Sequence, residues 1–203
     1  MKPTLTLIIA LVFAPLVSPT LAQSNDGRTI TLADDGRARY RIVAASDADG
    51  IEDYAAQTLA GYLKEMTGAE FSVVSPDEFK VDRPAIFVGL SEPALARLGP
   101  EPLANLRDQE HVARSVGQDI LLYGKGHRAS LDAVMEFLEN SLGWRWYSPF
   151  EKPVVPKLAT LTLKPFSRQR GFDFVSRQLA ARFDGDFYLQ HNVNMGLETK
   201  LRN

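Results

Sequence analysis

The chain has 203 residues, a formal net charge of −2 and no cysteine. The absence of cysteine excludes disulfide bonds, thiolate catalysis and cysteine-ligated metal sites. A weakly negative chain has no broad electrostatic reason to bind nucleic acid or an anionic membrane. The length predicts one domain, with some residues left over.

The first residues are typical of a secretory signal peptide. Lys2 gives a short positive start, residues 5–17 are apolar, and residues 19–22 form a small-residue cleavage site. The apolar run is too short to span a bilayer. We therefore expect residues 1–22 to be removed after Ala22. The mature protein should be exported to the periplasm or the extracellular space, with no membrane contact after cleavage.

The mature chain begins with a predicted β-hairpin and a predicted helix. Residues 29–32 and 37–43 alternate apolar and polar side chains on either side of an Asp-Asp-Gly turn. Residues 51–66 carry an apolar stripe at helical spacing. Gly68 follows where a helix end favours a residue able to adopt positive φ.

The middle of the chain alternates strands with a short helix. Residues 71–74 predict a strand, and residues 85–89 predict another that is apolar throughout, as is typical of the middle of a sheet. A serine followed closely by proline predicts a short helix over residues 91–98. Residues 111–116 and 119–123 flank a Gly-Gln turn and predict a second hairpin.

The best-specified stretch spans residues 119–156. Its strand leads through a glycine turn at residues 124–128 into a helix predicted to end near Leu142. Gly143 is suited to the helix C-terminus. Residues 144–147 then predict a strand with both tryptophans on one face, ended by a proline.

The remaining residues complete the predicted domain. Residues 159–163 alternate as a strand does, whereas the chain from Ser167 onwards has no sustained amphipathic pattern. Only a strand near residues 172–175 and a helix from about Phe187 are indicated there. The elements together predict an α/β (α+β) fold over residues 27–166, with a mixed sheet and its two long helices packed mainly on one face.

The glycine turn at residues 124–128 lies between a strand and a helix, where phosphate-binding loops occur. It lacks the third glycine of a dinucleotide fingerprint and the Gly-Lys-Ser/Thr ending of a P-loop. A tight turn with exposed cations is therefore favoured over a nucleotide site.

Other chemistry-bearing side chains give no site. Asp132, Glu136 and Glu139 share a helix face opposite the apolar stripe, which predicts a solvated face. The three histidines, His111, His127 and His191, are too scattered for a metal site, and no serine lies in a nucleophile elbow. The sequence predicts no catalytic, cofactor-binding or metal-ligating residue, and no cofactor.

The two tryptophans have two interpretations. Trp144 and Trp146 could stack on sugar rings, but their place after a buried helix favours core packing, with Trp146 the more buried of the two. Arg145 is expected to point to the other face, where a carboxylate could hold it.

The stretch Leu142-Gly143-x-Arg145-Trp146-Tyr147-x-Pro149, with the helix before it, resembles the N-terminal domain of the α-glucuronidases of glycoside hydrolase family 67. It equally resembles related large exported proteins that carry this domain. The helix ending in Thr67-Gly68 and the strand at residues 86–89 lie where that domain has similar elements. The resemblance covers about residues 29–166.

The resemblance implies a non-catalytic α/β domain like those of α-glucuronidases and β-hexosaminidases, which packs beside a (β/α)8 barrel. The family's catalytic carboxylates lie in that barrel, beyond the equivalent of Phe166, so no catalytic residue is carried over. A barrel needs about 250 residues, and residues 167–203 could supply only its truncated start.

Two functions remain open. The first is the inactive front part of an exported α-glucuronidase-like hydrolase that acts on xylan-type polysaccharide through the missing barrel. The second is a stand-alone exported module that binds carbohydrate or has a structural role. The sequence leaves the substrate and the oligomeric state open.

Overall fold

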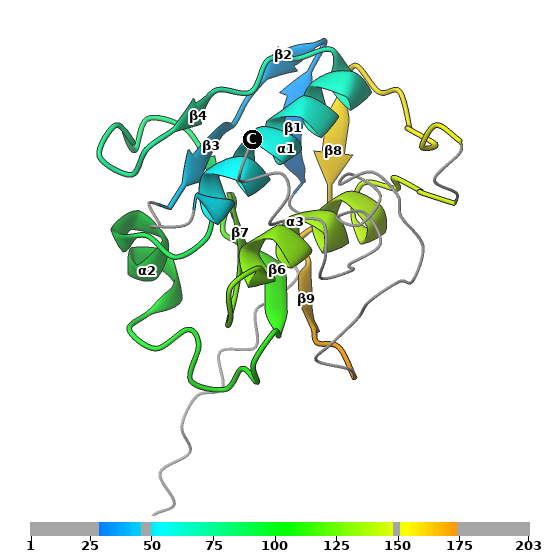
Figure 1. Cartoon of the computed structure of the whole chain (residues 1–203). Coiled ribbons are helices and arrows are strands. Elements are labelled where there is room, and N and C mark those ends of the chain that lie inside the picture. Colours follow the sequence, from blue (N-terminus) through cyan, green and yellow to red (C-terminus); the bar gives the residue numbers. More distant parts are fainter. Residues whose placement is uncertain (1–28, 46–49, 148–150, 174–203) are drawn as a thin grey trace, which may run out of the picture.

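The computed structural model describes residues 29–45, 50–147 and 151–173. These residues form a mixed α/β structure (Figure 1), which confirms the predicted fold class. The strands are β1 (Ile30–Asp34), β2 (Arg37–Ala38), β3 (Arg41–Ala44), β4 (Val73–Val74), β5 (Ala85–Val88), β6 (His111–Val116), β7 (Asp119–Gly124), β8 (Leu161–Leu163) and β9 (Ser167–Arg170). The helices are α1 (Ile51–Thr67), α2 (Glu92–Leu98) and α3 (Ala129–Asn140).

The larger sheet has six strands in the order β4-β3-β5-β7-β6-β9. The first four are parallel to one another, whereas β6 is antiparallel to both of its neighbours. All four residues of β5 are buried, as expected of a strand covered on both faces. The predictions that residues 85–89 lie inside the sheet and that β6 and β7 form a hairpin are confirmed.

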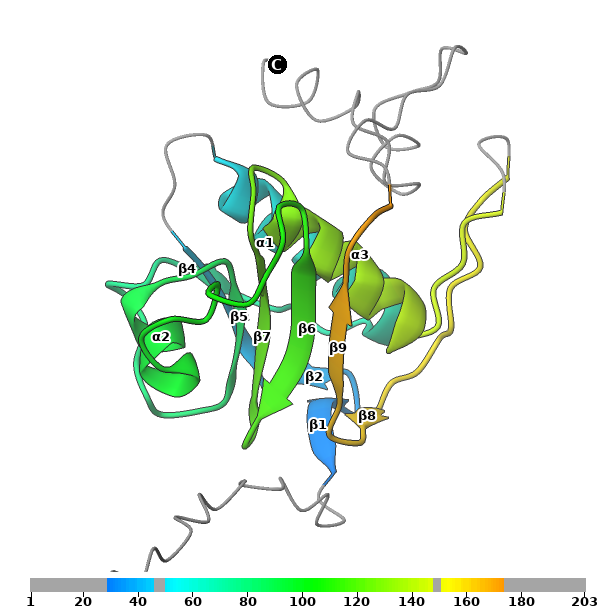
Figure 2. The ribbon, with the colours of Figure 1, turned by 90° about the horizontal axis from the view of Figure 1, so that it is seen from below.

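Different helices pack on the two faces of the large sheet. Ile86 and Val88 of β5 belong to the core cluster that contains the apolar residues of α1 and α3. Phe87, which points the other way, packs in a second cluster with Ala94 of α2. The two long helices therefore lie on one face, as predicted, and the short α2 lies on the other (Figure 2).

A glycine ends α1 where the sequence predicts, whereas α3 ends at Asn140 with Ser141 as its C-cap, just before the predicted end near Leu142. Gly68 follows α1 with φ of 76°, and Gly143, shortly after α3, has φ of 81°. Both angles are in the left-handed region that commonly ends a helix. Ser91 immediately precedes α2, although its side chain makes no capping hydrogen bond.

The predicted strand at residues 37–43 is wrong as a single element. Residues 37–38 pair with β1 in a small sheet of order β2-β1-β8, whereas residues 41–44 enter the large sheet as β3. The break occurs at Arg39 and Tyr40. Alternation along a sequence cannot show that two halves of one apolar run pair with different partners.

The predicted strand at residues 144–147 is also wrong. Only one isolated antiparallel bridge forms there, between Arg145 and Val154. Trp144 is completely buried and Trp146 only partly, so the predicted order of their burial is reversed. The positive φ of Gly143 turns the chain back, and the ring of Trp144 packs 4.6 Å from that of Tyr62 on α1.

Strand β9 is an element that the sequence does not predict. It pairs with β6 at the edge of the large sheet, so this sheet includes residues up to Arg170. The predicted strand near residues 172–175 is absent at Phe172 and Asp173, and its other residues lie outside the described part. The signal peptide and the helix from Phe187 also lie outside it.

Candidate functional site

Open parallel sheets bind ligands at the carboxyl ends of their strands, where the strand order reverses. Here the chain leaves β3 through α1 towards β4 and then crosses to β5, on the other side of β3. The reversal therefore lies between the carboxyl ends of β3 and β5. This edge is the first place to search for a site.

The Glu52 side chain fills the reversal point. Gly89, just after β5, has φ of 79°, and a Cβ there would lie 2.4 Å from Cγ of Glu52 and 2.9 Å from Cβ of Ala45. Ser130 at the start of α3 donates a hydrogen bond of 2.9 Å to Oε1 of Glu52. The carboxylate thus links the first turns of α1 and α3 in the space that a ligand would occupy.

Backbone hydrogen bonds hold the glycine turn between β7 and α3 against the loop that precedes β6. The amide of Lys125 donates to the carbonyl of Glu110 at 2.8 Å, and the amide of Gln109 donates to the carbonyl of Lys125 at 2.7 Å. A Cβ at Gly124 would lie 2.5 Å from the Glu110 carbonyl. The glycine is therefore required for close backbone packing.

The predicted solvated face of α3 is wrong for two of its three carboxylates. Asp132 and Glu136 are only 1% and 8% exposed, and Glu139 is partly buried. Asp132 pairs with Arg128 at 3.0 Å, and Glu136 pairs with Arg170 of β9 at 3.2 Å. Arg128, expected to be exposed, is therefore buried in an ion pair. Because β9 was not predicted, its cation at this face was missed.

The two described histidines lie in different parts of the fold. His111 on β6 is buried, and its ring centroid lies 5.6 Å from that of Phe172. His127 is exposed in the glycine turn, and His191 lies outside the described residues. In the part of the chain that the structure describes, no group of three or more histidine and carboxylate side chains could hold a metal ion.

Arg145 contacts backbone carbonyls instead of the expected carboxylate. Its guanidinium donates to the carbonyls of Glu139 and Trp144. The last turn of a helix leaves carbonyl groups without helical partners, and a nearby arginine can satisfy them. The side chain therefore completes the end of α3.

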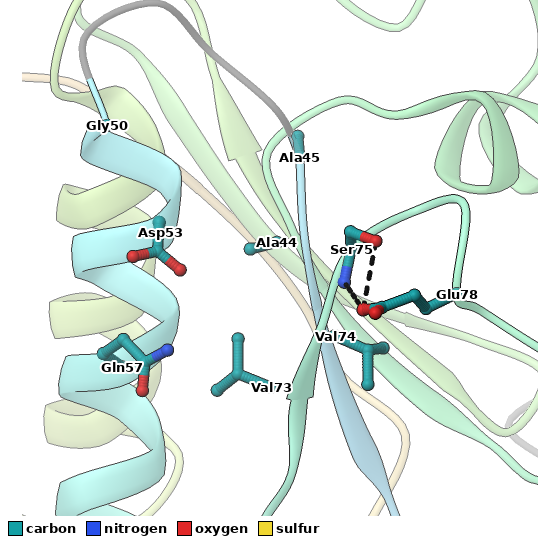
Figure 3. Close-up of a pocket in the computed structure, with 9 residues that line it drawn as sticks. All are labelled: Ala44, Ala45, Gly50, Asp53, Gln57, Val73, Val74, Ser75 and Glu78. Carbon is teal, nitrogen blue, oxygen red and sulfur yellow. Dashed lines mark hydrogen bonds between the residues drawn. The ribbon is translucent and has the colours of Figure 1, made fainter.

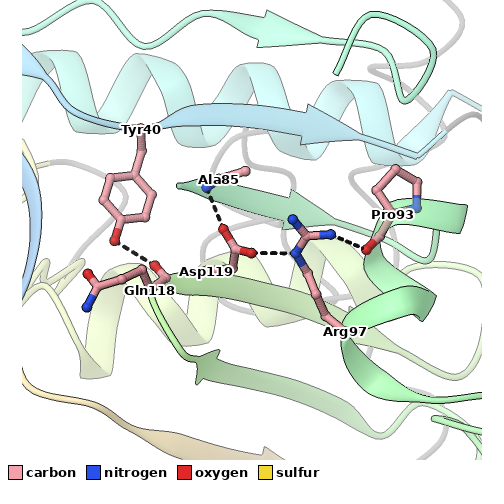
Figure 4. Close-up of polar contacts among 6 residues, drawn as sticks. All are labelled: Tyr40, Ala85, Pro93, Arg97, Gln118 and Asp119. Carbon is pink, nitrogen blue, oxygen red and sulfur yellow. Dashed lines mark hydrogen bonds and ion pairs between the residues drawn. The ribbon is translucent and has the colours of Figure 1, made fainter. Parts of the chain in front are cut away.

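A partly buried polar network joins the amino ends of the parallel strands to α2 (Figure 4). Asp119 accepts hydrogen bonds from the Ala85 amide, at 2.8 Å, and from the Arg97 guanidinium. Arg97 also lies over the Phe87 ring, with its central carbon 4.6 Å from the ring centroid. These contacts hold α2 against the sheet.

Tyr40 extends this network towards the β6–β7 turn. Its hydroxyl donates a 2.6 Å hydrogen bond to the carbonyl of Gln118. Burial of the phenol, with a smaller contribution from the negative charge of Asp119, raises the pKa of Tyr40 to about 12. The hydroxyl therefore stays protonated and has a structural role.

A pocket of about 300 Å³ lies between the first turns of α1 and the end of β4 (Figure 3). Asp53 and Gln57 of α1 form one wall, and Ser75 and Glu78 form the facing wall. Its other lining residues are Ala44, Ala45, Gly50, Val73 and Val74. These polar residues were not predicted from the sequence, although Ser75-x-x-Glu78 has the spacing of a capping box, which could have indicated the fixed glutamate.

A second cavity, of about 480 Å³, opens beside the small sheet, near the amino ends of the parallel strands. Its charged lining residues are Asp34, Arg39 and Arg83. Arg39 pairs with Asp34 at 2.6 Å, which leaves the exposed Arg83 as the lining cation with no ion pair in the described structure. The other lining residues of this open cavity are Thr29, Thr31, Tyr40, Pro84 and Gln118.

Among the described residues, no helix is long and apolar enough to cross a membrane.

No protein-family model matches the sequence, and no curated protein matches it. Among solved structures, the chain is similar to an enzyme of glycoside hydrolase family 138 that targets the pectin rhamnogalacturonan II. The two share 14% sequence identity with a TM-score of 0.32, and the match covers 57% of this chain and 11% of that enzyme. A match of this size identifies no activity for this chain.

Proposed function

We propose that the chain provides the non-catalytic N-terminal α/β domain of an exported glycoside hydrolase of the α-glucuronidase type. The whole enzyme would act in the breakdown of xylan-type polysaccharide. Its catalytic carboxylates and its polysaccharide site would lie in a (β/α)8 barrel that follows this domain. Because β9 belongs to the large sheet, the barrel would begin after Arg170. The 203-residue chain would be inactive alone.

The observation that carries this proposal is the packing of the signature residues 142–147. Trp144 is completely buried, and Arg145 donates a hydrogen bond to a carbonyl at the end of α3. Tyr147 is the exposed member, at 74%. The buried carboxylates of α3 are paired with cations, so they are poor candidates for acid–base catalysts. Because the side chains of this motif stabilise the fold, the motif favours a non-catalytic domain.

The proposal includes export through the signal peptide at residues 1–22. The measurement is the N-terminal sequence of the protein recovered from outside the cytoplasm of the source organism. A chain that begins at Gln23 is expected. Recovery of the protein from the cytoplasm with residue Met1 intact would contradict this part of the proposal.

The experiment for the enzymatic part begins with the source DNA. We expect the reading frame to continue for several hundred codons beyond Asn203 and its full product to release glucuronic acid from aldouronic acids. A stop codon directly after Asn203, or a full-length product that is inactive on these substrates, would contradict the proposal.

A stand-alone carbohydrate-binding or structural module is the second candidate. The pocket beside α1 favours this candidate, because polar side chains face one another across it. The buried Trp144 gives it no support, since its ring is not accessible to a sugar. A stop codon after Asn203 would favour this candidate over the hydrolase.

A further inference from the structure

The pocket between α1 and β4 is a small cavity with polar walls and an apolar floor. Asp53 and Gln57 are one helical turn apart on α1, so both side chains lie on the same side of the helix. Figure 3 shows Ser75 and Glu78 across the pocket from them. Val73 and Val74 of β4 lie between the two walls.

One of the polar walls is fixed before any ligand binds. Both the amide and the hydroxyl of Ser75 donate to Oε2 of Glu78, at 3.2 and 3.1 Å. These two hydrogen bonds hold the carboxylate in one orientation. A group held in place loses less conformational entropy when a ligand binds to it.

The lining residues restrict the charge of the ligand. Two of the four described polar lining side chains are carboxylates, and none of the described lining residues is a lysine, arginine or histidine. A phosphate, sulfate or carboxylate group would meet negative charge without a compensating cation. Ionised carboxylates only accept hydrogen bonds, whereas the Gln57 amide can donate and accept. The ligand must therefore supply several donors and carry no negative charge.

The two carboxylates give a cation little advantage over an uncharged donor. Asp53 and Glu78 are both exposed, and an ion pair in water contributes only about 0–1 kcal/mol. The described lining residues include no aromatic ring that could bind an ammonium group. A molecule with several hydroxyl groups suits the acceptors, and its C–H groups can contact Val73.

We propose that this pocket binds an uncharged, polyhydroxylated molecule of the size of one sugar ring. Asp53, Gln57 and Glu78 would accept its hydroxyl protons, and Val73, which packs on the α1 side of β4, would contact its apolar face. The volume of about 300 Å³ is at the lower end for ligand pockets. With few ligand atoms and an open site, the Kd should be in the millimolar range, on the order of 1 mM. This binding site is independent of any catalytic barrel.

The test is an NMR titration of the isotope-labelled 203-residue chain with D-xylose and, separately, D-galactose. Saturable shifts are expected for the backbone amides of Asp53, Gln57 and Ser75. Parallel titrations use D-glucuronate as the anionic probe and putrescine as the cationic probe. Both are expected to bind at least about tenfold more weakly than the better neutral sugar.

Asp53→Ala and Gln57→Ala are the informative variants, because both positions are exposed on α1 and alanine is the best helix former. Each is expected to weaken sugar binding by about three- to tenfold. Asp77→Ala is the matched control, since Asp77 is exposed beside Glu78 but does not line the pocket. It should leave binding unchanged.

Three results would overturn the proposal. The first is the absence of saturable shifts at the pocket with either neutral sugar. The second is tighter binding of D-glucuronate or putrescine than of the neutral sugars. The third is unchanged sugar binding in both α1 variants. Because the readout is binding by the chain itself, none of these results depends on whether a longer product has hydrolase activity.

Discussion

Gly89 ends β5 at the point where the Glu52 side chain crosses the carboxyl edge of the sheet. We expect Gly89→Ala to lower the free energy of unfolding by about 2–4 kcal/mol, because alanine is strained at φ of 79° and its Cβ overlaps Glu52. Urea unfolding measures this change. Gly61→Ala is the control, since Gly61 lies in α1 and a Cβ added there would meet no neighbouring atom within 4 Å. It should stabilise the protein by about 0.5–1 kcal/mol. Equal changes in the free energy of unfolding for Gly89→Ala and Gly61→Ala would show that Gly89 is not required at this position.

Trp144 is the largest completely buried side chain among the described residues. Trp144→Ala is expected to lower the free energy of unfolding by about 3–5 kcal/mol, because it leaves a cavity beside Tyr62. Trp146 is only partly buried, so Trp146→Ala should cost about 1–3 kcal/mol. Guanidinium unfolding of both variants measures the difference. A smaller effect at Trp144 than at Trp146 would show that the observed order of burial is wrong.

Tyr40 gives the fold a dependence on high pH. In the folded chain the pKa of Tyr40 is raised to about 12, compared with about 10 in an unfolded chain. The folded state therefore keeps the proton that the unfolded state loses, so this contribution to stability is complete below pH of about 10 and declines as pH rises towards 12. Burial raises the pKa of Tyr123 in the same direction.

Tyr40→Phe is the variant that isolates this effect. It should be about 1 kcal/mol less stable at neutral pH, because the hydrogen bond to the Gln118 carbonyl is lost. Its stability should then fall less steeply than that of the parent chain across the alkaline range, with Tyr123 contributing to the remaining slope. Urea midpoints measured from pH 8 upwards test this. Parallel curves of stability against pH for the two proteins would show that Tyr40 does not cause this pH dependence.

Single residues were predictable only where their neighbours in sequence decide their environment. The positive φ of Gly68 and Gly143 follows from their place after an apolar stripe. The contact between Glu52 and Ser130 joins residues 78 positions apart, so no local sequence pattern predicts it. The burial of Asp132 was mispredicted for the same reason, because a helical stripe shows one apolar face and gives no sign that the other face is also covered.

At the scale of elements, β9 shows why an edge strand is hard to predict. Its sequence, Ser-Arg-Gln-Arg, has no apolar alternation, since the strand has only one neighbour and is largely exposed. Charged residues are typical of sheet edges because they prevent pairing with other chains. The helices and the buried strand β5 were predictable, because packing on a core imposes a period that the sequence records.

We expect a chain truncated after Phe166 to be less stable than one truncated after Asp173. The shorter chain lacks β9, so β6 becomes an unpaired edge and the buried Glu136 loses Arg170 as its partner. Leaving a buried charge unpaired costs about 3–5 kcal/mol, although the exposure of Arg170 lowers the value here. Thermal unfolding of the two truncated chains, monitored by circular dichroism, measures the difference. Equal midpoints would show that β9 is dispensable for the domain.

At the scale of the whole molecule, the last two strands of the described chain pair with strands that come much earlier in the sequence. β8 pairs with β1 in the small sheet, and β9 pairs with β6 in the large one. Both sheets contribute to one core, in which Ile30 and Leu161 pack with the apolar residues of α1 and α3. The sequence predicted the class and most elements of this fold. It could not predict the division into two sheets, because that depends on pairings between distant strands.

The central claim is that the described domain contributes packing and no catalysis. The most direct measurement is an assay of the purified 203-residue chain on aldouronic acids, with release of glucuronic acid as the readout. A cooperative thermal transition should first establish that the sample is folded. The account predicts no release above the rate of a buffer control. Glucuronic acid release that is abolished together with the fold by Trp144→Ala would contradict it.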